Sequence, residues 1–205
     1  MRNIIEEAPG EHSIILYIEN IFSKDDLYLL EKWLVENTFI EQKKMSRKQI
    51  WYQRNQEYFC KDWVKRFPRW ESNEYDKTLD YFEKKIQCFI RTICDELNYP
   101  CVRTPNINSC LINKYSDEND FISPHQDTHL SFGMYPTIIG VSVGDTRTLK
   151  LKRVNRKIDN ININLQHGSV FILAGSTNKY FTHEIEKSKE KKNNRYSLTF
   201  REYIT

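Results

Sequence analysis

The sequence predicts a single α+β domain, and two contrasting patterns along its 205 residues support this. In the first half, apolar residues recur at helical spacing over two segments. From Ser109 onward, short alternating or apolar segments are separated by Gly, Asn and Asp, as is typical of successive strands. A chain of this length can bury a substantial core, and it shows no internal repeat or linker. We therefore expect residues 1–205 to form one domain in which helices pack on a sheet.

Local patterns place one strand and two helices in the first half. Residues Ile14–Phe22 predict an early strand and turn, after which Ser23 can cap a helix that runs to about Glu36. Its apolar stripe consists of Leu27, Leu30, Trp33 and Leu34. A second helix is predicted from about Asp76 to Leu97. Its apolar positions are Leu79, Phe82, Ile86, Phe89, Ile90, Ile93 and Leu97.

The segment RYSLTFR at the end of the chain alternates strictly. One face carries Arg195, Ser197, Thr199 and Arg201, and the other face is apolar. An edge strand with its polar face in water would show the same pattern. If the polar face points into a barrel, its two guanidinium groups and two hydroxyl groups form a socket for a dicarboxylic acid, since a guanidinium matches a carboxylate bidentately.

An H-x-D motif is the candidate for a metal site. In an extended strand, His125 and Asp127 project to the same side while Gln126 faces elsewhere. His183 would supply a third ligand. Two histidines and one carboxylate occupy one face of an octahedral Fe(II) and leave positions open for oxygen and a chelating co-substrate. H-x-D alone matches many chains by chance, so the surrounding motifs carry the interpretation.

Several motifs in order resemble the AlkB-like 2-oxoglutarate and Fe(II)-dependent dioxygenases, which remove alkyl groups from nucleic acid bases. They are N-x-Y at Asn113 and Tyr115, HQD at His125 to Asp127, SVGD at Ser142 to Asp145, LQHGSVFILAG at Leu165 to Gly175, HEI at His183 and RYSLTFR at Arg195 to Arg201. The resemblance covers residues 108–201, the expected catalytic core. It implies a double-stranded β-helix, the jelly-roll, with helices packed on one sheet. Periodicity alone predicts only a mixture of helices and strands.

The resemblance also implies roles for individual residues. The iron ligands and catalytic centre would be His125, Asp127 and His183, and the co-substrate would contact Asn113, Tyr115, Arg195, Ser197, Thr199 and Arg201. Arg195 would pair with the distal carboxylate of 2-oxoglutarate. Each residue also has an ordinary interpretation: Tyr115 as a half-buried strand residue, Asn113 as a turn residue, Arg201 as a surface charge. These explain the ordered set poorly.

Residues 46–70 are rich in aromatic and basic side chains, and the resemblance makes them a nucleotide-recognition lid. Trp51 and Tyr58 are the candidates for rings that stack on the target base, with Tyr52 in reserve. Arg47, Lys48 and Arg54 are candidates for phosphate contacts. The alternative is that Trp51, Trp63 and Trp70 are packing residues. His129 stands where many repair members of the family carry an acid that binds the base, and is a third candidate for substrate binding.

The implied activity is the oxidative demethylation of N-alkylated bases in DNA or RNA, that is, dealkylation repair. Fe(II), 2-oxoglutarate and O₂ would be required, and succinate, carbon dioxide and formaldehyde would be released. Two alternatives stay open. The same site could hydroxylate a protein or a small molecule, or the chain could be an inactive module that binds nucleic acid.

Composition bounds the partners and the compartment. The net charge of +3 is below that of a dedicated nucleic-acid-binding domain. Two basic runs are either solvated faces or phosphate contacts: Lys150, Lys152, Arg153, Arg156 and Lys157, and then Lys187, Lys189, Lys191 and Lys192. Five cysteines without paired C-x-x-C spacing predict free thiols. Without a signal-like start or a spanning apolar run, we expect a soluble intracellular monomer, cytoplasmic or nuclear, with no membrane contact.

Overall fold

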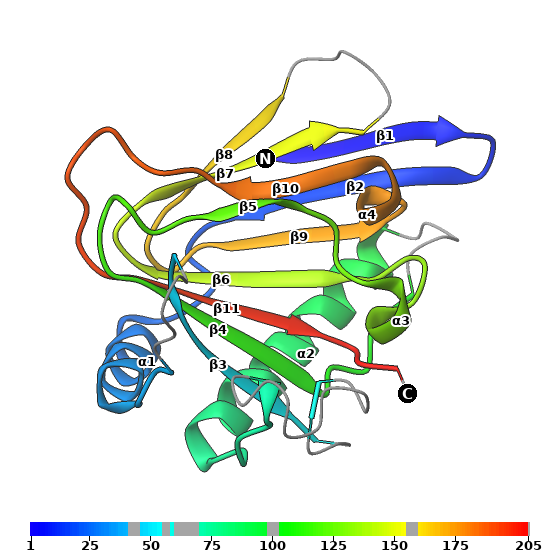
Figure 1. Ribbon diagram of the computed structural model, residues 1–205. Coiled ribbons are helices and arrows are strands. Elements are labelled where there is room, and N and C mark those ends of the chain that lie inside the picture. Colours follow the sequence, from blue (N-terminus) through cyan, green and yellow to red (C-terminus); the bar gives the residue numbers. More distant parts are fainter. Residues whose placement is uncertain (41–45, 55–57, 60–69, 98–102, 155–159, 205) are drawn as a thin grey trace.

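The protein consists of two antiparallel sheets packed face to face, with two long helices on the outside of the larger sheet (Figure 1). The computed structural model describes residues 1–40, 46–54, 58–59, 70–97, 103–154 and 160–204. The predicted jelly-roll with helices on one sheet is thereby confirmed.

The larger sheet has seven strands in the order β1-β2-β9-β6-β11-β4-β3. Their bounds are β1 Arg2–Ala8, β2 Glu11–Ile18, β3 Lys48–Gln53, β4 Ser109–Tyr115, β6 Ile138–Gly144, β9 Val170–Gly175 and β11 Arg195–Arg201. The smaller sheet has four strands in the order β5-β10-β7-β8. Their bounds are β5 Ile122–His125, β7 Arg147–Arg153, β8 Ile161–Leu165 and β10 Phe181–Ile185.

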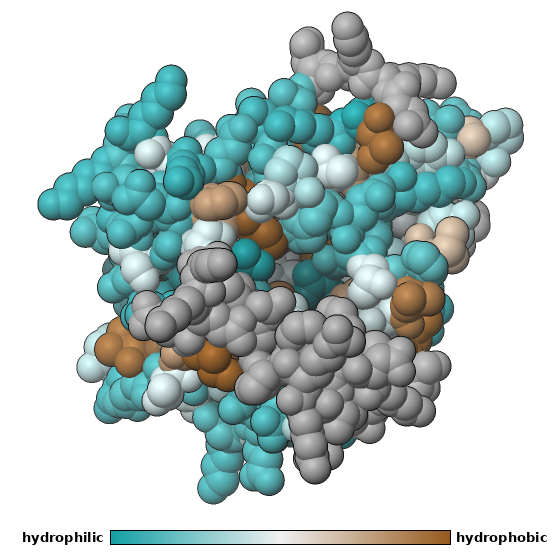
Figure 2. Space-filling model, in the orientation of Figure 1, coloured by the Kyte–Doolittle hydropathy of each residue, from teal (hydrophilic) through white to brown (hydrophobic). Residues whose placement is uncertain are grey.

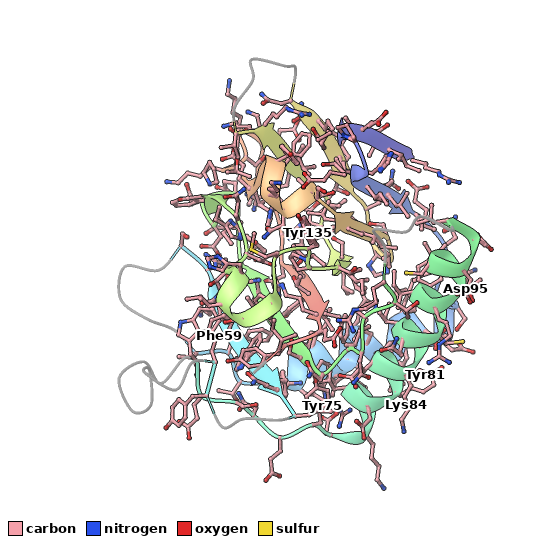
Figure 3. The ribbon with its side chains drawn as sticks, turned by 90° about the vertical axis from the view of Figure 1, so that its right-hand side faces the viewer. Phe59, Tyr75, Tyr81, Lys84, Asp95 and Tyr135 are labelled. Carbon is pink, nitrogen blue, oxygen red and sulfur yellow. The ribbon has the colours of Figure 1, made fainter. Side chains whose placement is uncertain are left out.

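Helices α1 (Lys24–Glu36) and α2 (Lys77–Leu97) bury their apolar stripes on the outer face of the larger sheet, as predicted. Ser23 begins α1 with a capping box: its hydroxyl accepts from the Asp26 amide, and the Asp26 carboxylate accepts from the Ser23 amide. Figure 3 shows α2 along one side of the sheet, with Tyr81, Lys84 and Asp95 on its outward side. Among the described helices, none is long and apolar enough to cross a bilayer.

The start of the chain differs from the prediction. The strand and turn predicted over Ile14–Phe22 correspond to the second half of β2 and the segment after it, but β2 begins earlier and β1 was not predicted. β1 and β2 form a hairpin through a turn at Gly10, where φ is +79°. β2 ends at Ile18 because Asn20 adopts φ +60° and turns the chain toward α1. The alternation of apolar and polar residues along β1 is weak, because β1 is an edge strand whose side chains are mostly half-buried.

Apolar side chains line part of the space between the sheets. Among them, Ile138, Leu149, Leu165 and Phe171 belong to one buried cluster. On β6, a Cβ at Gly140 would overlap the Phe171 ring, so only glycine allows the ring to lie against the β6 backbone. Every residue of β11 is buried, and its polar face points into this interior. The predicted solvated edge is therefore excluded for β11.

Three free cysteines lie in the part of the chain that the structure describes, as the spacing predicted: Cys88 is exposed, and Cys94 and Cys110 are buried. Cys60 and Cys101 fall outside the described residues.

Candidate active site

Three potential metal ligands converge in the cavity between the two sheets. His183 lies opposite His125 in the pairing of β10 with β5, and Asp127 follows two residues beyond the end of β5. One ligand atom from each of the three residues lies within 4.8 Å of the others. The two imidazole rings are 4.2 Å apart between centroids. This arrangement can hold one metal ion with two nitrogens and one oxygen.

The ionisation of these groups favours metal binding. Burial, together with the neighbouring His125, lowers the pKa of His183 to about 3, so its imidazole is neutral at physiological pH. Burial also lowers the pKa of His125. Burial by itself would raise the pKa of Asp127, but Arg201 and His183 more than offset it, and the pKa lies below its ordinary value. Neutral imidazoles and a carboxylate are the forms that coordinate a cation.

Two further contacts orient the ligands. His125 Nδ1 lies 2.9 Å from the carbonyl oxygen of Ser123, to which it can donate, leaving Nε2 for a metal. Arg201 Nε donates to Asp127 Oδ2 at 2.5 Å, and Nη2 donates to Oδ1 at 3.3 Å. The carboxylate therefore has a fixed orientation.

Arg195 is the strongest indication of a bound anion. Its side chain is fully buried on β11, and Nε donates to Ser142 Oγ at 3.0 Å. Within the described residues, Nη1 and Nη2 have no hydrogen-bond partner. Burial lowers the pKa of Arg195 to about 10, so it keeps its charge at neutral pH. A buried cation with two unused donors is costly unless a ligand supplies acceptors, and a carboxylate does so bidentately.

A cavity of about 950 Å³ joins the metal ligands to Arg195. Its polar lining includes the co-substrate residues that the sequence predicted: Asn113, Tyr115, Arg195, Ser197, Thr199 and Arg201. Its apolar lining includes Ile138, Leu149, Leu165 and Phe171. Figure 2 shows this face of the molecule hollowed near its centre. A dicarboxylate that chelates a metal at one end and reaches a guanidinium at the other end suits this lining.

Comparisons with known proteins agree with this geometry. The family model described as the 2OG-Fe(II) oxygenase superfamily matches residues 15–201. The chain belongs to the 2OG-Fe(II) oxygenase superfamily. Members take their name from 2-oxoglutarate and Fe(II), and with O₂ these are the cofactors that the sequence predicted. The convergent ligand atoms and the unpaired guanidinium fit both groups.

Curated relatives place this oxygenase near the AlkB-like proteins, which confirms the resemblance. It is 33% identical over 102 residues to "Alpha-ketoglutarate-dependent dioxygenase alkB homolog 3" of Rattus norvegicus, covering 46% of this chain and 35% of the relative. It is 27% identical over 135 residues to "DNA oxidative demethylase ALKBH2" of Arabidopsis thaliana, covering 55% and 42%. The matched part of the chain thus spans about a third to two fifths of these relatives.

Solved structures share the fold. "The structure of OsALKBH1" superposes with a TM-score of 0.68 at 17% identity, over 92% of this chain and 97% of that one. A prolyl hydroxylase from Trichoplax adhaerens, in complex with a hypoxia inducible factor peptide, superposes with a TM-score of 0.59 at 11% identity, over 93% and 83%. At these identities the likeness concerns the oxygenase fold alone.

The predicted substrate residues do not lie together. Trp51 lines the cavity, but it is fully buried and packs on Phe59 and Trp70, with ring centroids 5.1 and 6.1 Å away. Tyr58 is buried outside the cavity lining and bridges to Glu71. His129 is exposed at the start of helix α3 (His129–Phe132) and also lies outside the lining.

The reserve candidate for stacking and one candidate for phosphate contact lie away from the cavity. Tyr52 points to the opposite face of β3 from Trp51 and packs in the cluster under the helices, so it does not face the cavity. Arg54 also lies away from the cavity, in ion pairs with Asp80 and Glu83. Arg47 lines the cavity and donates to Asn113 Oδ1 at 2.8 Å. Lys48 is half-buried on β3, and Trp63 lies outside the described residues.

The first basic run is largely neutralised within the protein. Lys150 pairs with Glu186 at 2.9 Å and Lys152 with Glu184 at 2.5 Å, both across the smaller sheet. Arg153 pairs with Glu7. Arg156 and Lys157 fall outside the described residues. From the second run, Lys187 lines the cavity, with Nζ 5.3 Å from the centroid of the Phe121 ring.

Sequence reasoning missed an aromatic wall and a partner of Arg195. Phe59 and Phe132 join Trp51 and Trp70 along one side of the cavity. The sequence could have pointed to Phe132, because it follows the predicted metal ligand Asp127 by only five positions. Ser142 was noticed only as part of SVGD. Its contact with Arg195 follows from the register that places Ser142 opposite Ser197.

Proposed function

We propose that this chain is an Fe(II)- and 2-oxoglutarate-dependent dioxygenase that oxidatively demethylates N-alkylated bases in DNA or RNA. One observation carries the enzymatic part. The His125, Asp127 and His183 triangle and the unpaired guanidinium of Arg195 open into the same cavity. Superfamily membership supports the cofactors. The printed names of the relatives, a dioxygenase and a DNA oxidative demethylase, support the substrate class.

In this proposal the two ends of the cavity have different tasks. His125, Asp127 and His183 hold Fe(II), and Arg195 binds the distal carboxylate of 2-oxoglutarate. With O₂, the loaded site supplies the oxidising power to hydroxylate an N-methyl group, after which formaldehyde leaves and the base is restored. The co-substrate is oxidised to succinate and carbon dioxide in the same turnover.

The remaining residues of the cavity position these groups and exclude water. Arg201 keeps Asp127 ionised and fixed in orientation. Asn113 Oδ1 accepts from Arg47 and Gln49, which leaves the amide nitrogen of Asn113 directed elsewhere for the co-substrate. Tyr115 lies under Arg195, with the guanidinium carbon 5.1 Å from the ring centroid. Polar groups that are already fixed in position need little rearrangement during reaction.

On the substrate side, the aromatic wall and the cations at the cavity match a nucleotide. Phe59, Trp70 and Phe132 offer ring surfaces against which a base can pack. Arg47 and Lys187 place positive charge where phosphates of an adjoining backbone would lie. A base in a duplex would first have to leave its stack to reach this depth.

The decisive experiment is a formaldehyde-release assay with Fe(II), 2-oxoglutarate and oligonucleotides. The substrates are 1-methyladenine, 3-methylcytosine and 6-methyladenine, each in DNA and in RNA. We expect release from at least one of them, and none from the Asp127→Ala or His125→Ala variants. If methylated oligonucleotides leave 2-oxoglutarate decarboxylation unstimulated while peptides stimulate it, the nucleic acid substrate is wrong and the protein hydroxylase is favoured.

A further inference from the structure

The backbone of Asp127 lies beyond the reach of strand pairing. β5 is the edge strand of the smaller sheet, and its pairing with β10 includes His125 but ends before Asp127. A backbone N–H and C=O in a largely buried position need partners, because leaving either unpaired costs free energy. The sheet therefore fixes His125 directly but cannot fix Asp127.

One side chain supplies both missing partners. The Asp127 amide donates to Asn178 Oδ1 at 2.8 Å, and Asn178 Nδ2 donates to the Asp127 carbonyl oxygen at 2.9 Å. The two bonds also determine which amide atom is oxygen and which is nitrogen, since an N–H must face an acceptor and a C=O must face a donor. The amide of Asn178 thus takes the place of a neighbouring strand.

Asn178 is itself held firmly. It is only 7% exposed and lies in the short helix α4 (Thr177–Tyr180). Thr177 Oγ1 accepts from the Ile14 amide at 2.9 Å and lies 2.6 Å from the Ala174 carbonyl oxygen, which ties α4 to the larger sheet. Gln126 Nε2 donates to the Asn178 carbonyl oxygen at 2.6 Å. The middle residue of the HQD motif therefore binds α4 in return.

The same segment carries the third ligand. α4 runs directly into β10 at Phe181, and His183 follows two residues later. Asn178 therefore connects the chain bearing His183 to the backbone bearing Asp127. We propose that Asn178 is a positioning residue that sets Asp127 relative to the two histidines, so that the three ligands are arranged before a metal binds. This rests on the proposed function in so far as the triangle is a metal site.

The test is the affinity of the purified protein for Co(II), measured by titration of the visible spectrum under anaerobic conditions. Asn178→Ala is expected to weaken Co(II) binding roughly 10- to 100-fold, the usual effect of losing a residue that orients a ligand. The absorption bands should also change, because Asp127 can adopt other orientations. Asn164→Ala is the matched control: this asparagine is exposed on β8, and its amide oxygen accepts from Thr148 Oγ1. It should bind Co(II) like the wild type.

Two further variants separate positioning from folding. Asn178→Leu retains the branched shape of the side chain but makes neither hydrogen bond, and should weaken Co(II) binding as alanine does. Asn178→Gln retains the amide on a longer arm and should recover part of the affinity. Circular dichroism checks that each variant is folded. Wild-type affinity and spectrum in a folded Asn178→Ala or Asn178→Leu protein would overturn the inference, as would a glutamine variant no better than leucine.

These outcomes are distinct from failure of the proposed function. If the wild type does not bind Co(II), the metal site itself is wrong. If the wild type binds Co(II) and the Asn178 variants bind equally well, only the role of Asn178 is wrong. Neither result depends on a nucleic acid substrate.

Discussion

The guanidinium of Arg201 contacts both carboxylate oxygens of Asp127, although Arg201 ends β11 of the larger sheet, Asp127 follows β5 of the smaller sheet, and the two lie 74 positions apart in the sequence. Both side chains are nearly inaccessible, with exposed fractions of 6% and 7%. A pair this deeply buried is expensive to break from one side, because the remaining charge has no water to solvate it.

Replacement of Arg201 should therefore reduce stability strongly. We expect Arg201→Ala to lower the free energy of unfolding of the metal-free protein by about 3 to 5 kcal/mol, measured by urea denaturation. The matched control is Arg103→Ala, which removes a pair with Glu202 whose arginine is 74% exposed and should change little. If both variants lost the same free energy of unfolding, burial would not explain the effect of Arg201→Ala.

Replacement of Arg195 should act on the co-substrate. Arg195→Ala removes the only cation proposed to meet the distal carboxylate, and we expect a loss of about 2 to 5 kcal/mol, or roughly 30-fold or more in the KM for 2-oxoglutarate. Arg91→Ala, at an exposed position of α2, is the control. An unchanged KM in the Arg195 variant, with turnover retained, would remove Arg195 from the co-substrate site.

Acid should destabilise the metal-free protein through His183. Its pKa is lowered to about 3 in the folded state, against about 6.5 in an unfolded chain. As the pH falls below about 6.5, the unfolded chain binds a proton at this histidine, whereas the folded protein does so only near pH 3. The folded state therefore keeps its full stability above pH 6.5 and loses stability progressively as the pH falls toward 3. Between pH 6.5 and 5 we expect a loss of about 2 kcal/mol from this group. His183→Asn should show a flatter pH profile in urea denaturation. The same slope in both proteins would exclude His183 as the cause.

The salt dependence of oligonucleotide binding should distinguish the two basic runs. Each cation that contacts phosphate contributes about 0.7 to 0.9 to the slope of log affinity against log salt concentration. Lys150 and Lys152 are already paired with glutamates, so Lys150→Gln and Lys152→Gln together should leave the slope nearly unchanged. Lys187→Gln should reduce the slope by about 0.7 to 0.9, the contribution of one phosphate contact. Fluorescence anisotropy over a salt series measures both, and the opposite ranking would place the nucleic acid on the smaller sheet.

The sequence was informative where periodicity and motif order coincide. Strict alternation of RYSLTFR correctly predicted one polar face for Arg195 and Arg201, and the Ser23 cap and apolar stripes correctly predicted both long helices. The alternation could not decide whether the polar face meets water or the interior. That depends on which strands flank β11, and these come from distant parts of the chain.

Contacts that depend on tertiary register were beyond the sequence. Asn178 binds the backbone of Asp127, 51 positions away. Because nearly all residues carry the same backbone groups, the residue types cannot reveal such a contact. The glutamate partners of Lys150 and Lys152 follow from the pairing of β10 with β7, which no local pattern specifies. Trp51 was predicted to stack on the target base, with a packing residue as the alternative. The structure shows a fully buried ring that packs on its neighbours and lines the cavity, and stacking on a base stays a prediction.

Gly140 of β6 also affects the shape of the cavity. Phe171 lines the cavity, and its ring occupies the space that a side chain at Gly140 would need. Any larger residue at position 140 would force this ring to move, and the shape of the cavity would change with it. The room left for a diacid therefore depends partly on a residue that does not line the cavity.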